Sequence, residues 1–108
     1  MYFHDPSTRL SKELLPGIDA RTFWGENMLL AVVDLEANAV IPPHAHTHEQ
    51  GGIVLEGEMD FTIGGVEKHL NPGDLYIIPG DVEHSVQVGP SPARVLDIFS
   101  PVREEYKY

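Results

Sequence analysis

Turn-forming residues recur at short intervals along most of this chain, and their spacing limits what it can fold into. Proline and glycine fall in small clusters, separated by short runs rich in β-branched and aromatic residues. The clusters are Pro42-Pro43, Gly51-Gly52, Gly57, Gly64-Gly65, Asn71-Pro72-Gly73-Asp74, Pro79-Gly80-Asp81 and Gly89-Pro90. Short strands with such punctuation are typical of a β-sandwich or β-barrel. Because the links are too short for crossover connections, the strands should pair antiparallel. We therefore predict an all-β domain.

Alternation of apolar and polar residues places individual strands. Met59, Phe61 and Ile63 alternate with polar residues, which is the pattern of a half-buried strand. The glycine pair that follows suits a tight hairpin. Further strands are expected at residues 29–35, 66–70, 75–78, 84–88 and about 94–99. Helix is expected only as single turns within 11–15 and 101–108.

Size and composition narrow the class of protein. The 108 residues fit one domain, 1–108, with the barrel core at about 28–100. The absence of cysteine excludes disulfides and thiolate metal sites. A net charge of −10 argues against nucleic acid and anionic membranes as partners. The N-terminal segment lacks the features of a secretory signal, and no apolar run is long enough to span a membrane, so we expect a cytoplasmic protein.

Three of the six histidines lie within residues 43–50. Side chains two apart on an extended strand face the same side, so His44 and His46 should present two imidazoles to one space. Gln50, at an expected bend, can return a side-chain oxygen to that space. His84 lies on the apolar face of its own strand, where an unpaired imidazole costs on the order of a few kcal/mol. A metal ion resolves this, since neutral imidazole is the commonest metal ligand. We predict one divalent transition metal ion bound by His44, His46, Gln50 and His84.

The alternative interpretation is that histidines lie on the surface of an acidic protein. We adopt it for His4 and His69. For His48 two positions stay open, the surface and the mouth of the site without contact to the metal. Imidazole-rich sites suit several metals, so the ion is left open among zinc, nickel, manganese and iron.

The histidine-bearing segments resemble the cupin superfamily. Its first motif runs glycine, five residues, His-x-His, three or four residues, glutamate, six residues, glycine; this chain has Asn38, His44, His46, Gln50 and Gly57 there. Its second motif runs glycine, five residues, Pro-x-Gly, two residues, histidine; this chain has Gly73, Pro79, Asp81 and His84. The resemblance implies a jelly-roll-like barrel, the double-stranded β-helix.

Three positions depart from these motifs. Asn38 replaces a glycine, and asparagine tolerates left-handed backbone fairly well. Asp81 replaces a turn glycine, beside Gly80. Gln50 replaces the usual glutamate, and a neutral amide cannot act as a base. It leaves a bound metal with its full charge, which makes a stronger Lewis acid and suits a carboxylate substrate.

Longer segments resemble the pectin-degradation cupins of the KdgF type. They are residues 44–50, 54–58, 61–65, 72–74, 76–79 and 96–104, within a likeness that covers about 28–106. This resemblance implies an enzyme, usually a homodimer, that opens the ring of 4,5-unsaturated uronates made by polymer lyases. The product is the linear 5-keto-4-deoxyuronate, so the expected partner is a small acidic sugar. The first twenty residues are a candidate dimer interface.

Asp97, Phe99 and Arg103 are the candidate catalytic residues. Val95, Asp97 and Phe99 share one face of the expected last strand, which puts an acid on an apolar face and raises its pKa or demands a partner. The alternatives are a water-facing acid on an edge strand and a surface arginine. The family pattern Asp-x-Phe-Ser-Pro-x-Arg favours function. It implies that Asp97 moves a proton, Arg103 holds the substrate carboxylate and Phe99 packs against the sugar.

Two other functions stay open. One is a non-catalytic cupin that binds a small acidic sugar. The other is a metal-dependent dioxygenase or oxidoreductase. Loss of the ultraviolet absorbance of an unsaturated uronate without oxygen uptake would select ring opening, whereas oxygen consumption with iron or manganese would select the dioxygenase.

Overall fold

The computed structural model describes residues 2–108 and confirms the all-β prediction. Ten strands follow one another: β1 (Lys12–Leu15), β2 (Ile18–Trp24), β3 (Leu29–Leu35), β4 (Val40–His44), β5 (Glu49–Glu56), β6 (Met59–Ile63), β7 (Val66–Leu70), β8 (Leu75–Ile78), β9 (His84–Val88) and β10 (Ala93–Ser100). Helix is limited, in the described chain, to the 3-10 turns η1 (Pro6–Thr8) and η2 (Glu104–Tyr106). Within residues 2–108 no helix is long and apolar enough to cross a membrane.

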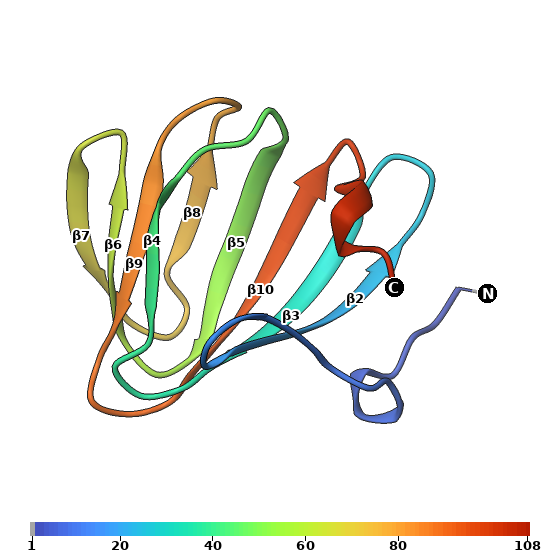
Figure 1. The fold of residues 1–108 in the computed structure, drawn as a ribbon, viewed down its shortest axis with the longest axis horizontal. Coiled ribbons are helices and arrows are strands. Elements are labelled where there is room, and N and C mark those ends of the chain that lie inside the picture. Colours follow the sequence, from blue (N-terminus) through green and yellow to red (C-terminus); the bar gives the residue numbers. More distant parts are fainter. Residues whose placement is uncertain (1) are drawn as a thin grey trace.

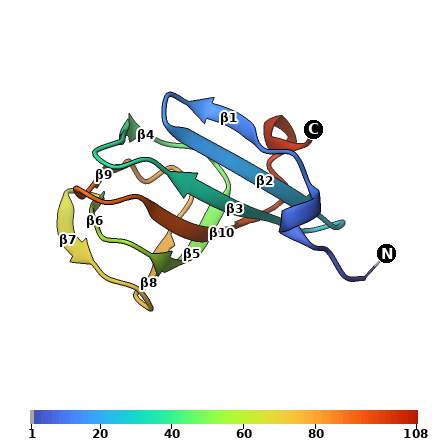
Figure 2. The same ribbon diagram turned by 90° about the horizontal axis from the view of Figure 1, so that it is seen from below.

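The strands form two antiparallel sheets. The larger has six strands in the order β1-β2-β3-β10-β5-β8, and the smaller has four in the order β4-β9-β6-β7 (Figure 1). Figure 2 shows the two sheets curving around a common interior. This is the double-stranded β-helix expected from the sequence.

The inner face of the larger sheet places the site residues. In β3 burial alternates strictly, with Leu29, Ala31, Val33 and Leu35 inside, as predicted. On β10 the buried Val95 and Phe99 flank Asp97 on the same inward face. The core apolar side chains therefore surround one inward-facing acid.

Residues 11–15 do not form the expected helical turn. They contribute β1, whose Lys12 pairs with Ala20 of β2. The helix propensity of Lys-Glu-Leu-Leu is weak compared with the ladder hydrogen bonds that β2 offers. Gln50 is also not at a bend, because it is the second residue of β5. The helical turn expected near the C-terminus is confirmed as η2.

Two tight turns have the left-handed backbone that the motif comparison predicts. Asn38 has φ 62° and Asp81 has φ 66°. The Asp81 N–H donates to the carbonyl oxygen of His46 at 2.8 Å. Gly80 lies so close to Thr47 that an added Cβ would be 2.5 Å from its carbonyl oxygen. The turn between β8 and β9 therefore packs directly on the segment that carries His46.

Candidate metal site

Three histidines converge between the two sheets. His44 ends β4 and pairs across the ladder with His84, the first residue of β9, and their ring centroids are 4.2 Å apart. His46 lies just beyond β4, with its ring centroid 5.0 Å from that of His84. One ring nitrogen from each histidine lies within 4.8 Å of the others, close enough for one ion. The structure thus brings together three of the four predicted ligands.

Backbone carbonyls fix the orientation of all three rings. The Nδ1 atoms of His44, His46 and His84 lie 2.9, 3.0 and 2.9 Å from carbonyl oxygens. The carbonyls belong to Pro42, His48 and Val82. A carbonyl oxygen can only accept, so each Nδ1 carries the proton and each Nε2 presents a lone pair. This is the arrangement that orients metal-binding imidazoles.

The Nε2 lone pairs lack ordinary partners. Nε2 of His84 is buried without a hydrogen-bond partner among residues 2–108. Nε2 of His46 lies 3.0 Å from Oε1 of Gln50, so two acceptors face each other. Protonation of the imidazoles would relieve this, but burial lowers the pKa of both His46 and His84. A cation shared by these atoms satisfies every one of them, so the residues present fit a divalent metal.

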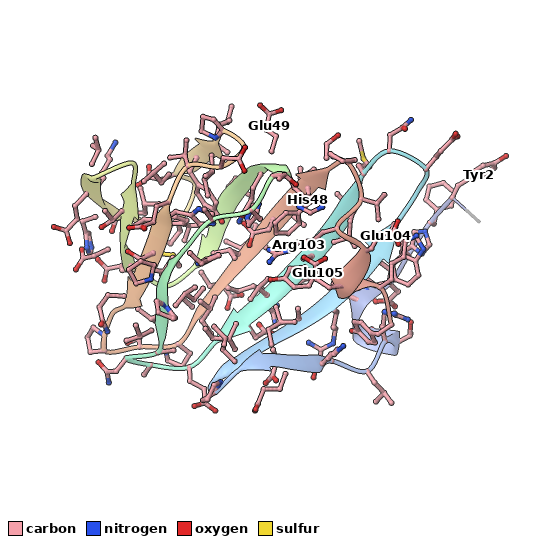
Figure 3. All side chains as sticks on the ribbon, turned by 45° about the horizontal axis from the view of Figure 1, so that its top comes forward. Tyr2, His48, Glu49, Arg103, Glu104 and Glu105 are labelled. Carbon is pink, nitrogen blue, oxygen red and sulfur yellow. The ribbon has the colours of Figure 1, made fainter. Side chains whose placement is uncertain are left out.

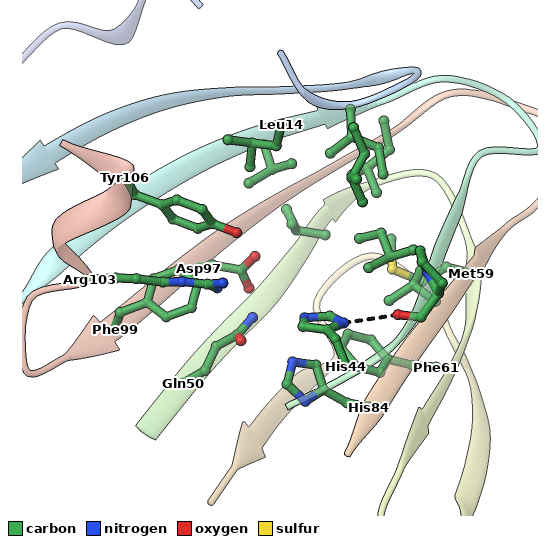
Figure 4. Close-up of a pocket in the computed structure, with 18 of the residues that line it drawn as sticks. Leu14, His44, Gln50, Met59, Phe61, His84, Asp97, Phe99, Arg103 and Tyr106 are labelled. Carbon is green, nitrogen blue, oxygen red and sulfur yellow. Dashed lines mark hydrogen bonds between the residues drawn. The ribbon is translucent and has the colours of Figure 1, made fainter. Parts of the chain in front are cut away.

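Gln50 connects the histidines to Asp97. It is buried on β5, and its Oε1 lies 3.0 Å from Nε2 of His46. A hydrogen bond from its side chain to the Asp97 carboxyl lowers the pKa of that group. Figure 4 shows Gln50 between Asp97 and the rings of His44 and His84. The predicted fourth ligand is therefore next to the histidine cluster, although it comes from the opposite sheet. Metal binding by these four residues stays a prediction.

Asp97 is a carboxyl group with an unusual environment. Burial raises its pKa to about 6, against the opposing effects of hydrogen bonds from Tyr76 and Gln50 and of the charge on Arg103. The Tyr76 hydroxyl donates to Oδ1 of Asp97 at 2.6 Å. A carboxyl group with a pKa close to neutrality can both accept and release a proton. Asp97 thus lies on the inward face of β10 between Val95 and Phe99 and has a hydrogen-bond partner in Tyr76, while its catalytic role stays a prediction.

Arg103 lies at the same site, held by groups of the C-terminal segment. Its side chain is only 14% exposed, and its Nε donates to Oε1 of Glu105 at 2.6 Å (Figure 3). Its guanidinium carbon is 4.1 Å from the ring centroid of Tyr106 and 5.3 Å from that of Phe99. Figure 4 shows the guanidinium pointing toward Gln50 and Asp97. Arg103 is therefore not a free surface residue.

A cavity of about 480 Å³ joins these groups. At one end it is lined by polar side chains, namely His44, Gln50, His84, Asp97, Arg103 and Tyr106. Its lining also includes aliphatic side chains, among them Val33, Leu35, Val86 and Leu14, and Figure 4 shows Leu14 on the side away from His84. A ligand that enters meets the histidines, Asp97 and Arg103 together in one part of this cavity.

Two of the remaining histidines lie on the surface as predicted, and the third, His48, is partly buried. His4 and His69 are exposed, and His69 lies between two carboxylates, 2.9 Å from Glu58 and 2.8 Å from Asp60. His48 is partly buried, with its ring 5.7 Å from that of His46. It therefore lies beside the cluster without belonging to it.

Sequence reasoning missed two cavity residues, Tyr76 and Tyr106. Tyr76 lies in an uninterrupted apolar run, so alternation gives no sign of which residues point inward. Tyr106 lies in η2, where no periodic pattern applies. A signal for Tyr76 did exist in Gly52, whose missing side chain leaves room for an aromatic ring on the next strand.

Comparison with known proteins agrees with this architecture. The Cupin_2 family model, described as a cupin domain, matches residues 31–99. Among solved structures, an RmlC-like cupin from Shewanella frigidimarina has a TM-score of 0.93 and 26% identity, covering 99% of this chain and 96% of that one. KdgF from Halomonas sp. has a TM-score of 0.92 and 26% identity, covering 99% of both chains.

Two enzymes are similar in sequence. Dimethylsulfoniopropionate lyase DddW of Ruegeria pomeroyi is 34% identical over 68 residues, which are 63% of this chain and 45% of that protein. H2HPP isomerase of Bacillus subtilis is 26% identical over 95 residues, 86% of this chain and 40% of that protein. The chain thus spans less than half the length of these relatives. With the family model matched over 31–99 and cupin structures aligned along nearly the whole chain, this protein belongs to the cupin family.

Proposed function

We propose that this cupin is a metal-dependent enzyme that opens the ring of 4,5-unsaturated uronates to the linear 5-keto-4-deoxyuronate. The observation that carries the proposal is the contact of Gln50 with both His46 and Asp97, which couples a histidine cluster to an acid with a pKa of about 6. Similarity to KdgF along the whole chain supports it. So does the presence of a lyase and an isomerase among the relatives, since both names denote reactions without net oxidation.

The reaction is an isomerisation that needs proton transfer and charge stabilisation. The bond between C1 and the ring oxygen breaks, the C1 hydroxyl loses its proton to give the aldehyde, and the ring oxygen becomes an enol at C5. The enol then gains a proton at C4 and loses one from oxygen, which gives the ketone. A divalent ion, when bound, supplies Lewis acidity toward substrate oxygens.

The chain's own residues fill the other roles. Asp97 carries the proton to C4, directly or through water, because its carboxyl lies in the cavity and its pKa is near neutral. Arg103 holds the substrate carboxylate, since Glu105 engages its Nε and the two terminal nitrogens offer a two-pronged donor. Phe99 packs beside His46, with ring centroids 5.7 Å apart, and forms a flat apolar surface for the sugar face.

A direct assay tests the proposal. Metal-loaded protein is mixed with a 4,5-unsaturated galacturonate, and absorbance of the conjugated double bond is followed together with dissolved oxygen. We expect absorbance to fall with no oxygen uptake, and the product to be a linear dicarbonyl acid by mass and NMR. Oxygen consumption would select the oxidoreductase alternative. Ligand binding without turnover would select the non-catalytic alternative.

We also propose that the protein is a homodimer, with the outer face of the larger sheet between the copies. Leu75 and Ile77 of β8 are 73% and 71% exposed, and Ile98 of β10 lies in the same cross-strand row as Ile77. Beside them Asp34 pairs with both Arg21 and Arg94, so this cluster carries no excess negative charge. On a chain of charge −10, an apolar face whose paired charges are not negative in sum is where two copies meet with the least repulsion.

A further inference from the structure

Asp97 and Tyr76 lie in one row across three strands of the larger sheet. Asp97 of β10 pairs with Gly52 of β5, and Gly52 pairs with Tyr76 of β8. The Tyr76 side chain crosses over Gly52, and its hydroxyl donates to Oδ1 of Asp97 at 2.6 Å. A phenol two strands away thus reaches the acid because the residue between them has no side chain.

The space over Gly52 is fully taken by the phenol. A Cβ added at Gly52 would be 2.3 Å from Cζ of Tyr76 and 2.4 Å from its hydroxyl oxygen. The backbone at Gly52 has no left-handed conformation that would call for glycine. The glycine is therefore required by the close approach of Tyr76 and not by its own φ angle.

The ring of Tyr76 is also held from the opposite sheet. Phe61 of β6 contacts it with ring centroids 4.6 Å apart, and Tyr76 is only 7% exposed. Burial, with the negative charge of Asp97, raises the pKa of the Tyr76 phenol, so it stays protonated as a donor. Ring packing and the glycine cradle leave the hydroxyl one place to point.

We propose that Tyr76 is a positioning residue for Asp97, and that Gly52 is the cradle that makes this possible. By occupying Oδ1, the phenol sets the direction in which the second carboxylate oxygen faces the cavity. The role assigned to Asp97 in proton transfer rests on the proposed function, whereas the hydrogen bond and the cradle do not.

Two variants with a matched control test this inference through activity. Tyr76→Phe removes the hydroxyl and keeps the ring, and Gly52→Ala pushes the ring away from Asp97. For each we expect kcat to fall about 10–100-fold, with KM and metal content within about twofold of wild type. Gly51→Ala is the control, since its added Cβ would approach nothing in the described chain closer than 3.9 Å. Unchanged kcat in Tyr76→Phe would overturn the inference.

A second measurement does not depend on turnover. In metal-free protein, proton NMR should show a downfield, slowly exchanging hydroxyl resonance that is lost in Tyr76→Phe and shifted in Asp97→Asn. A resonance whose chemical shift is unchanged in Asp97→Asn would also overturn the inference, as would the absence of such a resonance in the wild-type protein. If wild-type protein fails to open unsaturated uronates, the proposed function is wrong, and the resonance alone decides whether Tyr76 positions Asp97.

Discussion

At the scale of single residues, three backbone carbonyls decide which imidazole nitrogens face the site. The carbonyls of Pro42, His48 and Val82 engage the Nδ1 atoms and leave the Nε2 atoms as free lone pairs. Each carbonyl is two residues away from its histidine in sequence, so the local backbone path sets the ring orientation. Gln50 then adds an oxygen without adding charge.

The first prediction concerns Gln50. We expect Gln50→Ala to weaken metal binding by about tenfold or more, because one oxygen ligand and the orientation of its neighbours are lost. Isothermal titration with zinc or nickel measures the change. Asp97→Asn is the matched control, and we expect it to bind metal like wild type. Unaltered metal affinity in Gln50→Ala would show that Gln50 is not a ligand.

The second prediction concerns Asp97. Replacing it by asparagine keeps the size of the side chain and removes the carboxyl group that accepts and releases a proton, so kcat should fall by about 10²–10⁴-fold. The expected result is loss of absorbance change in the uronate assay, with metal content unchanged by elemental analysis. Full activity in Asp97→Asn would remove this residue from the mechanism.

The sequence predicts whether a side chain points into the core where polar and apolar residues alternate, and it does not where a run is uniformly apolar. Asp97 stands out because Val95 and Phe99 flank it on one face. Tyr76 does not stand out, because residues 75–78 are all apolar and their alternation of exposed and buried appears only in three dimensions. The link from Gln50 to Asp97 also needed the fold, since it joins adjacent strands distant in sequence.

At the scale of elements, β3 and the strands from β6 to β10 were predicted, whereas the N-terminal hairpin and β5 were not. β6 and β7 are joined by Gly64-Gly65, both with positive φ, as expected for a tight hairpin. The turn between β1 and β2 also contains a glycine with positive φ, Gly17, but Lys12–Leu15 does not alternate in polarity and becomes a strand because it pairs with β2. Pairing between segments is decided by tertiary contacts that local propensity does not contain.

The third prediction concerns the turn before β6. Gly57 has φ +79°, and an added Cβ would be 2.5 Å from the carbonyl oxygen of Pro92. Both effects oppose a side chain, so Gly57→Ala should lower the free energy of unfolding by about 2 kcal/mol. Gly25→Ala, where a Cβ would meet no described atom within 4 Å, should change it by less than about 0.5 kcal/mol. Urea denaturation measures both, and equal effects would contradict the account.

The fourth prediction concerns pH and the β6–β7 hairpin. Hydrogen bonds to Glu58 and Asp60 raise the pKa of His69 above its ordinary 6.5. A raised folded-state pKa stabilises the fold below the unfolded-state pKa, and this stabilisation is lost as pH rises through the folded-state pKa. His69→Gln should therefore reduce stability at about pH 5 and leave it unchanged at about pH 9. The effect is small because the group is exposed. A larger loss at high pH would reverse the sign and contradict the interpretation.

At the scale of the whole molecule, the two sheets contribute different parts of the site. The smaller sheet supplies His44 and His84, and the segment that follows β4 supplies His46. The larger sheet supplies Gln50, Asp97 and Phe99. The outer face of the larger sheet is apolar where its inner face carries chemistry, so association of two copies would also support the wall behind Asp97.

The fifth prediction tests that association. Ile77→Asp places a charge on the proposed interface and should convert a dimer to a monomer, as measured by light scattering after size-exclusion chromatography. Val66→Asp is the control, because Val66 is equally exposed at 71% but belongs to the smaller sheet. Dimers that persist in Ile77→Asp and dissociate in Val66→Asp would place the interface elsewhere.

We have argued that three imidazoles on and just after the smaller sheet and an amide oxygen from the larger sheet hold one divalent cation beside Asp97. A crystal structure of metal-loaded protein, with anomalous data at the absorption edge of the metal, would locate this cation. We expect a single anomalous peak bonded to Nε2 of His44, His46 and His84 and to Oε1 of Gln50. A peak bonded to other residues, or no peak between the sheets, would contradict it.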